Sequence, residues 1–461
     1  MKKYILIPVL LLTLTLTSCF EDIDDIEQIA SNSEINDFIY RGLNYYYLYK
    51  ADTPELANDA FASNEAKVEF IDSFNTPEAI FSYLLSDQEP PFSVLFDNYI
   101  ELENTLNGIT LNNGMKHGFV RYPDGGTNVF GYVRLVLPNS NAEEAGLERG
   151  LIFNTVNGTQ ITDTNYLDIL EAETYTLGLA TYDGNTVTPT GENVTLTKEQ
   201  YTENPVYITK TIDHEGIKVG YLMYNGFTST YDETLNSVFG QFKAEGISEL
   251  VLDLRYNGGG SVRSATDLSG MITGQFTDQV LYTEQWNDDR QDEEASDGLF
   301  TSQTTNGSAL NSLNLTKLYV LTTGSTASAS ELVINCLSTY IDVVQIGLNT
   351  RGKFQASRLL YDAPAPYFNR SDANTGHTYA MLPLIFKTAN TAGNTDYIDG
   401  LIPDIEISED YSNLGQLGDV NETLLAAALN DILPGPVAPP KNHNNVKELE
   451  FKEGLEVMVV N

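Results

Sequence analysis

The chain has 461 residues and a hydrophobic content of 41%, which is enough for two or three domains with buried cores. Its 64 acidic and 25 basic residues give a net charge of −39. Such a surface repels the phosphates of nucleic acids and anionic membranes, which argues against a nucleic-acid-binding function. The acidic residues are scattered along the sequence, which favours a role in solubility outside the cytoplasm over an acidic binding site.

Residues 1–18 have the basic start and short apolar core of a secretory signal peptide, and this run is too short to span a membrane permanently. Leu16 to Cys19 resemble a bacterial lipobox, which implies that Cys19 becomes the lipidated first residue of the mature chain. A lone cysteine in an ordinary signal peptide is the alternative. The acidic segment 19–34 resembles the tether of surface-exported lipoproteins of Bacteroidetes-like bacteria. We therefore expect an outer-membrane lipoprotein of the cell envelope, facing the periplasm or the cell surface.

The cysteine and histidine content argues against disulfide and metal chemistry. If Cys19 is lipidated, only Cys336 remains, so an internal disulfide is excluded. Cys336 lies on the apolar face of a predicted helix and is expected in the core. The four histidines are scattered and form no pattern of metal ligands. The sequence therefore predicts no metal site and no cofactor.

Helical spacing of apolar residues begins at Ile35 and predicts a small helical domain over residues 35–108. Thr76 and Pro77 provide an N-cap and a first-turn proline for one of its helices. The tyrosine run at 45–47 could form a stacking platform for sugars. Aromatic residues at helical spacing are more often core residues, and we favour the core interpretation.

Residues 109–200 are rich in Gly, Asn, Thr and Val and contain short alternating runs, which predicts a β-rich module. Over residues 137–158, a proline turn, a short helix ending Ala-Gly-Leu, a glycine, an apolar strand and Asn-Gly succeed one another. This succession resembles a PDZ domain, which implies capture of peptide C-termini by strand addition. We expect residues 115–120 to form the carboxylate loop, with Gly118 and Phe119 contacting the peptide. A plain hairpin is the alternative.

Residues 205–432 are predicted to form an α/β core. The runs 218–224 and 249–254 are predicted strands, and a helix between them is predicted to end at Gly246. The second strand leads into a turn with three consecutive glycines, residues 258–260. Such a turn presents backbone N–H groups that can hold an oxyanion. Phosphate is a poorer ligand because no nucleotide-binding glycine pattern is present, and a purely structural turn is the alternative.

The segment 318–355 is predicted to form a β-α-β unit, because a helical pattern lies between two apolar, strand-like runs. Both strands of such a unit end at the same edge of the sheet. Ser328 follows the first strand and Lys353 follows the second. We therefore expect these two side chains to meet.

Ser328 has two interpretations. Ser328 and Glu331 form a capping box, which alone would explain both residues. A nucleophile is favoured because the serine lies at a strand-to-helix turn, in the same domain as the glycine turn and at the same edge as Lys353. No histidine is placed near this edge, so either a lysine serves as the base or no residue does, and Lys353 is the candidate. Its pKa would have to fall by about three units, at a cost of roughly 4 kcal/mol, and we expect Phe354 to assist by desolvation.

The remaining segments are predicted from their local patterns. Residues 275–316 are polar and are expected to form strands and loops over the sheet that could serve as a lid. A strand is predicted over 379–387 and a final helix over 420–432. Residues 433–461 are expected to be a proline-rich linker and a tail that is an appendage to the core.

Three stretches resemble the carboxyl-terminal processing, or tail-specific, serine peptidases, which are related to the tricorn core. They are the Thr-Ala-Ser-Ala-Ser-Glu motif at 326–331, the Leu-Asp-Leu-Arg-Tyr-Asn-Gly-Gly-Gly turn at 252–260 and the Asp-Gly-Leu-Ile-Pro-Asp segment at 399–404. The resemblance covers roughly residues 110–410. Gly258 stands where the family usually has proline.

The resemblance implies a role for each matching residue. Ser328 takes the position of the nucleophile, and Lys353, in the Arg-Gly-Lys motif, that of the base. The backbone N–H groups of Gly259 and Ala329 take the position of the oxyanion hole. The family has a supporting glutamine a few residues after its lysine, whereas Gln355 lies only two residues after Lys353.

These observations predict a membrane-tethered serine endopeptidase that captures the C-terminal tails of proteins or peptides and cleaves them with a Ser-Lys dyad. The alternative from another class is a catalytically inactive, peptide- or glycan-binding surface lipoprotein on the same scaffold. An esterase or amidase with the same nucleophile is a second enzymatic alternative. The sequence leaves the oligomeric state open.

Overall fold

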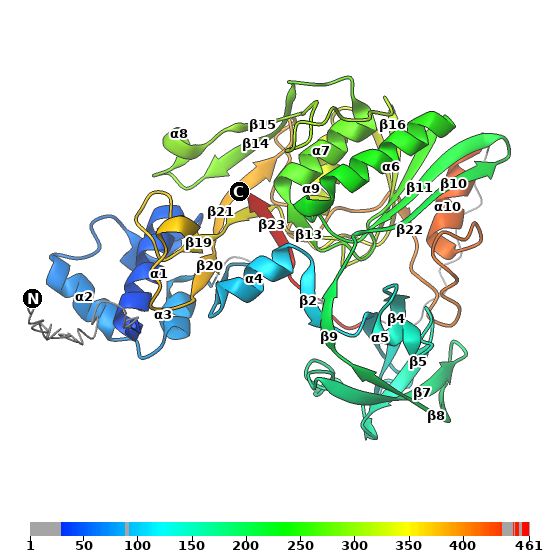
Figure 1. Cartoon of the computed structure of the whole chain (residues 1–461), viewed down its shortest axis with the longest axis horizontal. Helices are drawn as coiled ribbons and strands as arrows, with labels where there is room; N and C mark the ends of the chain where they lie inside the picture. Colours follow the sequence, from blue (N-terminus) through cyan, green and yellow to red (C-terminus); the bar gives the residue numbers. More distant parts are fainter. Residues whose placement is uncertain (1–28, 88–91, 436–445, 447, 451–453, 461) are drawn as a thin grey trace, which may run out of the picture.

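The computed structural model describes residues 29–87, 92–435, 446, 448–450 and 454–460. An N-terminal helical region, a β-rich module and an α/β core make up the fold, which confirms the predicted α/β multi-domain class. In Figure 1 the helical region (blue) lies to one side of the core (green to orange), and the β-rich module (teal) lies below it. The predicted signal peptide and Cys19 lie outside the described residues. In the described part of the chain, no helix is long and apolar enough to cross a membrane.

The N-terminal region is built from capped helices whose apolar faces join the core. The side chains of Ser31 and Glu34 cap the first helix reciprocally, and Thr76 caps the third, as predicted. Tyr46 and Tyr47 are buried, which confirms the core interpretation of that run. The first three helices share one hydrophobic cluster with the α/β core, whereas Leu102 and Tyr99 of the fourth helix lie in two smaller clusters. Its elements are α1 (Asn32–Tyr46), α2 (Asn64–Asp72), α3 (Pro77–Leu84), β1 (Val94–Phe96) and α4 (Tyr99–Leu106).

The β-rich module is a curled antiparallel sheet with strand order β3-β4-β5-β7-β8, and β6 pairs with β5. The separate ribbon β2-β9 joins it to the rest of the chain. The prediction of a carboxylate loop at 115–120 is wrong, because these residues form a strand that pairs with β4 along its length. The elements are β2 (Ile109–Asn112), β3 (Met115–Arg121), β4 (Val129–Val136), α5 (Asn141–Glu144), β5 (Ile152–Val156), β6 (Thr159–Gln160), β7 (Thr174–Tyr182), β8 (Val187–Thr197) and β9 (Glu199–Thr202).

The main sheet of the core has the order β10-β11-β12-β16-β17-β22, and all its strands except β10 run parallel. Its predicted strands and helices are all present. The elements are β10 (Val206–His214), β11 (Ile217–Tyr224), α6 (Asp232–Glu245), β12 (Glu249–Asp253), α7 (Val262–Thr273), β16 (Lys317–Thr322), α9 (Ala329–Leu337), β17 (Asp342–Gly347), β22 (Ile405–Glu406) and α10 (Thr423–Ile432).

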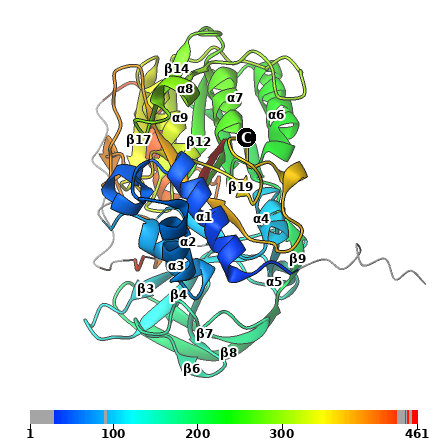
Figure 2. The same ribbon diagram turned by 90° about the vertical axis from the view of Figure 1, so that its left-hand side faces the viewer.

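Both faces of this sheet are covered by helices, as expected for parallel strands. Leu250 and Leu252 on β12 belong to the cluster that contains α6, α7 and α9, whereas Val251 belongs to the cluster that contains α10. Figure 2 shows α6, α7 and α9 of the core behind the N-terminal helices, with the β-rich module beneath. Cys336 on α9 is fully buried in the core, as predicted, and burial raises the pKa of its thiol.

A second sheet, with the order β13-β23-β18-β21-β14-β15, lies next to the main one. The segment expected to form a lid contributes β14 and β15 to this sheet. The expectation that the C-terminal tail is an appendage is wrong, because β23 lies between β13 and β18. The elements are β13 (Gly259–Ser261), β14 (Val280–Trp286), α8 (Gln291–Glu294), β15 (Asp297–Leu299), β18 (Gln355–Arg358), β21 (Leu384–Ala389) and β23 (Val457–Val460). A separate small sheet is formed by β1, β20 (Ala380–Leu382) and β19 (Leu360–Tyr361), in that order.

Candidate active site

Ser328 occupies a strained turn between β16 and α9. Its φ of 66° and ψ of −116° lie outside the regions that a residue other than glycine readily adopts. The side chain is fully buried, and its Oγ makes no hydrogen bond to any described residue. A buried hydroxyl without a partner is costly, so such groups gather at functional sites. The arrangement is typical of a nucleophile held in a sharp strand-to-helix turn.

The glycine turn lies directly against Ser328. A β-carbon placed on Gly259 would lie 3.0 Å from the Oγ of Ser328, and Gly259 has a φ of 107°. Only glycine accommodates both this conformation and this approach. The Gly259 N–H donates to Oδ1 of Asn257 at 2.9 Å.

Asn257 joins the glycine turn to the serine turn. Its backbone oxygen accepts from the N–H of Ala327 at 3.0 Å and from the hydroxyl of Ser330 at 3.1 Å. Its Nδ2 donates to the backbone oxygen of Tyr224 at 2.8 Å. The ends of β11, β12 and β16 are therefore tied together beside Ser328.

Glu331 connects Ser328 to Lys353. One of its oxygens, Oε2, accepts from the backbone N–H of Ser328 at 2.7 Å and from that of Lys353 at 2.9 Å. The other, Oε1, accepts from the N–H of Gly352 at 2.7 Å and the hydroxyl of Thr350 at 2.6 Å. Burial raises the pKa of this carboxyl to about 7, against the lowering effect of these hydrogen bonds. The structure thus brings the backbones of Ser328 and Lys353 to one carboxylate, and the predicted meeting of their side chains stays a prediction.

Lys353 is fully buried, and its Nζ donates to the backbone oxygen of Glu456 at 2.6 Å. The ring of Phe92 lies 4.9 Å from the same Nζ. Phe354, expected to desolvate the lysine, instead packs its ring against Tyr397 at 5.3 Å. The aromatic neighbour of the ammonium group therefore comes from the N-terminal region. Lys353 and Phe354 have different neighbours because successive side chains of an extended chain point to opposite sides.

Gln355 is fully buried at the start of β18. Its Nε2 donates to the hydroxyl of Tyr49 at 2.7 Å, and its Oε1 makes no hydrogen bond to a described residue. The contact with Tyr49 connects the strand after Lys353 to the N-terminal region. Gln355 therefore helps to position this strand.

A buried cluster of ion pairs lies at the end of β12, next to the glycine turn. The guanidinium of Arg255 is fully buried and bonds to Asp253 at 2.8 Å, to Glu422 at 2.7 Å and to Glu409 at 3.0 Å. The carboxylates raise the pKa of Arg255 well above its usual value against the effect of burial. The neighbouring guanidinium groups of Arg149 and Arg255 lower the pKa of Glu409 to about 2 despite its burial. The cluster fixes the end of β12 against the segment that leads into α10.

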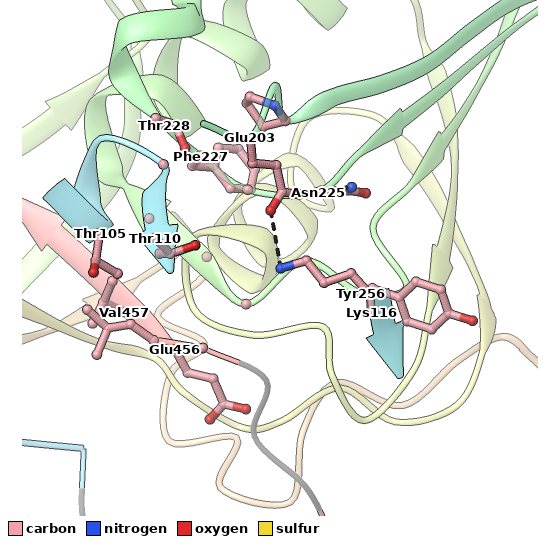
Figure 3. A pocket seen from close by; sticks show the side chains of 18 of the residues that line it. Thr105, Thr110, Lys116, Glu203, Asn225, Phe227, Thr228, Tyr256, Glu456 and Val457 are labelled. Atoms are coloured by element: carbon pink, nitrogen blue, oxygen red, sulfur yellow. Dashed lines mark hydrogen bonds and ion pairs between the residues drawn. The ribbon is translucent and has the colours of Figure 1, made fainter. Parts of the chain in front are cut away.

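A cavity of about 180 Å³ opens beside the glycine turn, between the core and the β-rich module. Figure 3 shows Lys116 paired with Glu203 across it, and Glu456 and Val457 of the C-terminal tail on the opposite side. The Lys116 Nζ lies 3.2 Å from a carboxylate oxygen of Glu203. Apolar and polar atoms both line this space, as is common for ligand-binding cavities.

The predicted peptide-binding residues Gly118 and Phe119 lie on β3, away from the serine. The backbone oxygen of Phe119 accepts from the N–H of Leu449 at 2.8 Å. A side chain on Gly118 would meet the carboxylate of Glu448 and the ring of Tyr132. Both residues therefore contact a polypeptide segment, which belongs to the C-terminal part of the same chain.

Sequence reasoning missed four features of this site. Glu331 was assigned only to a helix cap, and Asn257 received no role, because hydrogen bonds between distant segments leave no periodic signal. The tail strand β23 had a usable signal, since residues 457–460 are a short apolar, β-branched run. Arg255 could have been singled out as a charged residue directly after a buried strand.

Comparisons with known proteins agree with this architecture. The family model described as Peptidase family S41 matches residues 218–407, and that of the Peptidase S41 N-terminal domain matches residues 34–94. The solved structure of a Bacteroides fragilis protein assigned as an S41 protease is 30% identical in sequence. The match covers 86% of this chain and 96% of that one, with a TM-score of 0.67.

Two curated relatives are carboxyl-terminal-processing proteases of cyanobacteria. The one from Picosynechococcus sp. is 31% identical over 229 residues, which are 48% of this chain and 50% of the relative. The one from Synechocystis sp. is 28% identical over 310 residues, which are 66% of this chain and 64% of the relative. The matches thus span between half and two thirds of the length of these relatives. From the family models and the structural match over 86% of its length, the chain belongs to peptidase family S41, the family of the carboxyl-terminal processing proteases.

Proposed function

We propose that the protein is a serine endopeptidase in which Ser328 is the nucleophile and Lys353 the general base. The observation that carries the proposal is the Glu331 carboxylate oxygen that accepts from the backbone N–H groups of both residues. This shared acceptor holds the two residues together beside a glycine turn. The unpartnered hydroxyl of Ser328 and the burial of Lys353 support the same roles.

The chemistry follows from these positions. Neutral Lys353 accepts the hydroxyl proton as the Oγ of Ser328 attacks the carbonyl carbon of a peptide bond. The N–H of Ala329, the first residue of α9, has no acceptor within the helix and supports the developing oxyanion. The N–H of Gly259 is the second donor once it shares or leaves its bond to Asn257. Lys353 then protonates the leaving amine, and water hydrolyses the acyl-enzyme.

We also propose that the β-rich module is a PDZ-like domain that captures polypeptide substrates. Support comes from the hydrogen bond that β3 makes to an extended segment through the backbone of Phe119. Strand addition at such an edge reads the backbone and so accepts many sequences. Proteins or peptides with an unfolded tail are the substrates that fit this arrangement.

The location of the protein is proposed from its N-terminus. The lipobox-like residues Leu16 to Cys19 support an envelope lipoprotein anchored through Cys19. Metabolic labelling with a radioactive fatty acid should mark the protein, and Cys19→Ser should abolish the label. Equal labelling of both proteins would contradict this proposal.

The peptidase proposal is tested with the full-length protein and a denatured, carboxymethylated polypeptide. Ser328→Ala and Lys353→Ala should each lower kcat/KM by about 10³-fold or more, because neither half of a nucleophile and base pair works alone. A fluorophosphonate should label the wild type at Ser328 and leave Ser328→Ala unlabelled. Cleavage at equal rates by all three proteins would refute the assignment. Binding of the polypeptide without cleavage or labelling would instead favour the inactive, peptide-binding alternative.

A further inference from the structure

The C-terminal tail of the chain crosses the candidate active site. Its strand β23 pairs in parallel with β13 on one side, where Gly259 is opposite Val457 and Ser261 is opposite Val459. On its other side it pairs in parallel with β18, where Ser357 is opposite Val459. β13 begins in the glycine turn and β18 begins just after Lys353. The tail thus fills the slot between the two walls of the site (Figure 1).

The backbone of the tail contacts the candidate catalytic groups. Lys353 donates to the backbone oxygen of Glu456 at 2.6 Å. A β-carbon on Gly259 would meet both the backbone oxygen of Val457 and the side chain of Ser328. The backbone oxygen of Val457 and the side chain of Ser328 therefore both lie against Gly259, where its β-carbon would project.

An upstream part of the tail is held by the β-rich module. The N–H of Leu449 donates to Phe119, and Glu448 lies antiparallel to Val120. The carboxylate of Glu448 bonds to Arg134 at 2.7 Å and to the hydroxyl of Tyr132 at 2.6 Å. This is strand addition at the edge that the proposed function assigns to substrates.

Arg351 forms ion pairs with two parts of the tail, one near the β-rich module and one near Ser328. Its guanidinium pairs with Glu450, near the β-rich module, and with Glu456 at 3.3 Å, near the serine. Val457 and Val459 pack with Leu102 and Leu382 in a small apolar cluster. The described tail residues therefore make backbone, ionic and apolar contacts both at the β-rich module and beside the glycine turn.

We infer that the described tail residues, 448–450 and 454–460, occupy the substrate site of their own chain in the way that a polypeptide substrate does, and so inhibit the enzyme. This inference rests on the proposed function and adds its regulation. Val457 is the tail residue opposite Gly259, and the apolar cluster around its side chain favours an aliphatic residue there. Because the segment is part of the chain, its effective concentration is high, and other polypeptides must displace it.

The test measures how fast a fluorophosphonate labels Ser328 in the full-length protein and in variants of the tail. Glu448→Lys removes the pairing with Arg134, and Val459→Pro removes an N–H from β23. Both variants should be labelled at least about ten times faster than the wild type. Glu192→Lys, an equal change of charge at an exposed position outside the tail, should be labelled at the wild-type rate.

Two further measurements make the result specific. A synthetic peptide of residues 446–461 should slow the labelling of Glu448→Lys when it is added in excess. Hydrogen exchange should find the amides of residues 454–460 protected in the wild type and exposed in Glu448→Lys. Circular dichroism checks that each variant is folded.

The outcomes separate this inference from the proposed function. Equal or slower labelling of folded tail variants, or unprotected tail amides in the wild type, would overturn the inference and leave the peptidase proposal standing. Protected tail amides that become exposed in Glu448→Lys, without labelling of any protein, would support occupancy of the site and refute the peptidase proposal.

Discussion

At the scale of single residues, Glu331 decides whether the site is assembled. Its carboxylate receives four hydrogen bonds, two of them from the backbones of Ser328 and Lys353. The group is fully buried, and its pKa is about 7 instead of the ordinary 4.5. It is a positioning residue, since it acts through the residues that it holds.

The raised pKa makes stability depend on pH. The pKa of Glu331 is higher in the folded chain than in the unfolded chain, so its protonation stabilises the folded state. This contribution is complete below pH 4.5 and is lost as the pH rises through 7. The expected loss is about 3 kcal/mol. Urea denaturation at several pH values should show this slope in the wild type, and Glu331→Gln should remove it. The same slope in both proteins would contradict the assignment of the pKa to Glu331.

Glu331→Gln should also lower the peptidase rate. The amide nitrogen cannot accept the N–H groups that the carboxylate accepts, so Ser328 and Lys353 lose their common anchor. We expect kcat to fall by at least about tenfold with a smaller change in KM, because a misplaced nucleophile and base slow the chemical step. Steady-state kinetics on a fluorogenic peptide measures this effect. A change confined to KM would contradict the positioning role.

Gly259 should tolerate no side chain. Its φ is 107°, and a β-carbon would collide with Ser328 and with the tail at Val457. Gly259→Ala should therefore destabilise the protein by about 1–3 kcal/mol and abolish cleavage. Gly258→Ala is a matched control, because a β-carbon there meets its nearest atom at 3.6 Å. Equal denaturation midpoints and equal rates for the two variants would contradict the prediction.

At the scale of elements, the end of β12 depends on Arg255. Its guanidinium forms ion pairs with three buried carboxylates, those of Asp253, Glu409 and Glu422. Such a cluster adds little net stability as a whole, yet removing one partner leaves buried charges without compensation. We therefore expect substitution of Arg255 to disturb the turn that carries Gly259.

Arg255→Met should lower the free energy of unfolding by about 3–5 kcal/mol. Arg121→Met removes an arginine whose ion pair with Asp163 is partly exposed, at 39% and 22% of the two side chains. It should change stability by about 1 kcal/mol or less. Denaturant unfolding of both variants tests the contrast, and a loss for Arg255→Met no larger than that for Arg121→Met would contradict it.

At the scale of the whole molecule, the N-terminal helices and the α/β core should unfold together. Phe38 on α1 lies in the same hydrophobic cluster as the three core helices on its side of the sheet. Phe153 on β5 lies in a cluster formed almost entirely by the β-rich module. Loss of a buried phenylalanine costs about 3–5 kcal/mol. Phe38→Ala should therefore lower the stability of the core as well as that of the helices.

Hydrogen exchange with mass spectrometry tests this prediction by measuring the protection of each region separately. Phe38→Ala should speed the exchange of β12 and β16, whereas Phe153→Ala should act mainly on β4, β5 and β7. A variant at Phe38 that leaves the core strands as protected as in the wild type would show that the helical region unfolds independently.

The local elements could be predicted well from the sequence. The helix from Ala329, the strands around it and the end of α6 at Gly246 all follow from short periodicities and turn residues. The pairing of Ser328 with Lys353 followed from topology, because parallel strands joined by a helix end at one edge. The loop predicted at 115–120 failed because pairing with β4 overrides local glycine content.

The sequence by itself determined the kind of sheet, the nature of the strand-to-helix turns and the identity of the two central residues. These properties depend on residues close together in the chain. Only the tertiary structure decided that Glu331 holds the two turns together, that Phe92 lies over Lys353 and that the tail fills the slot beside Ser328. Each of these contacts joins residues from separate segments, and the folded core alone brings such segments into register.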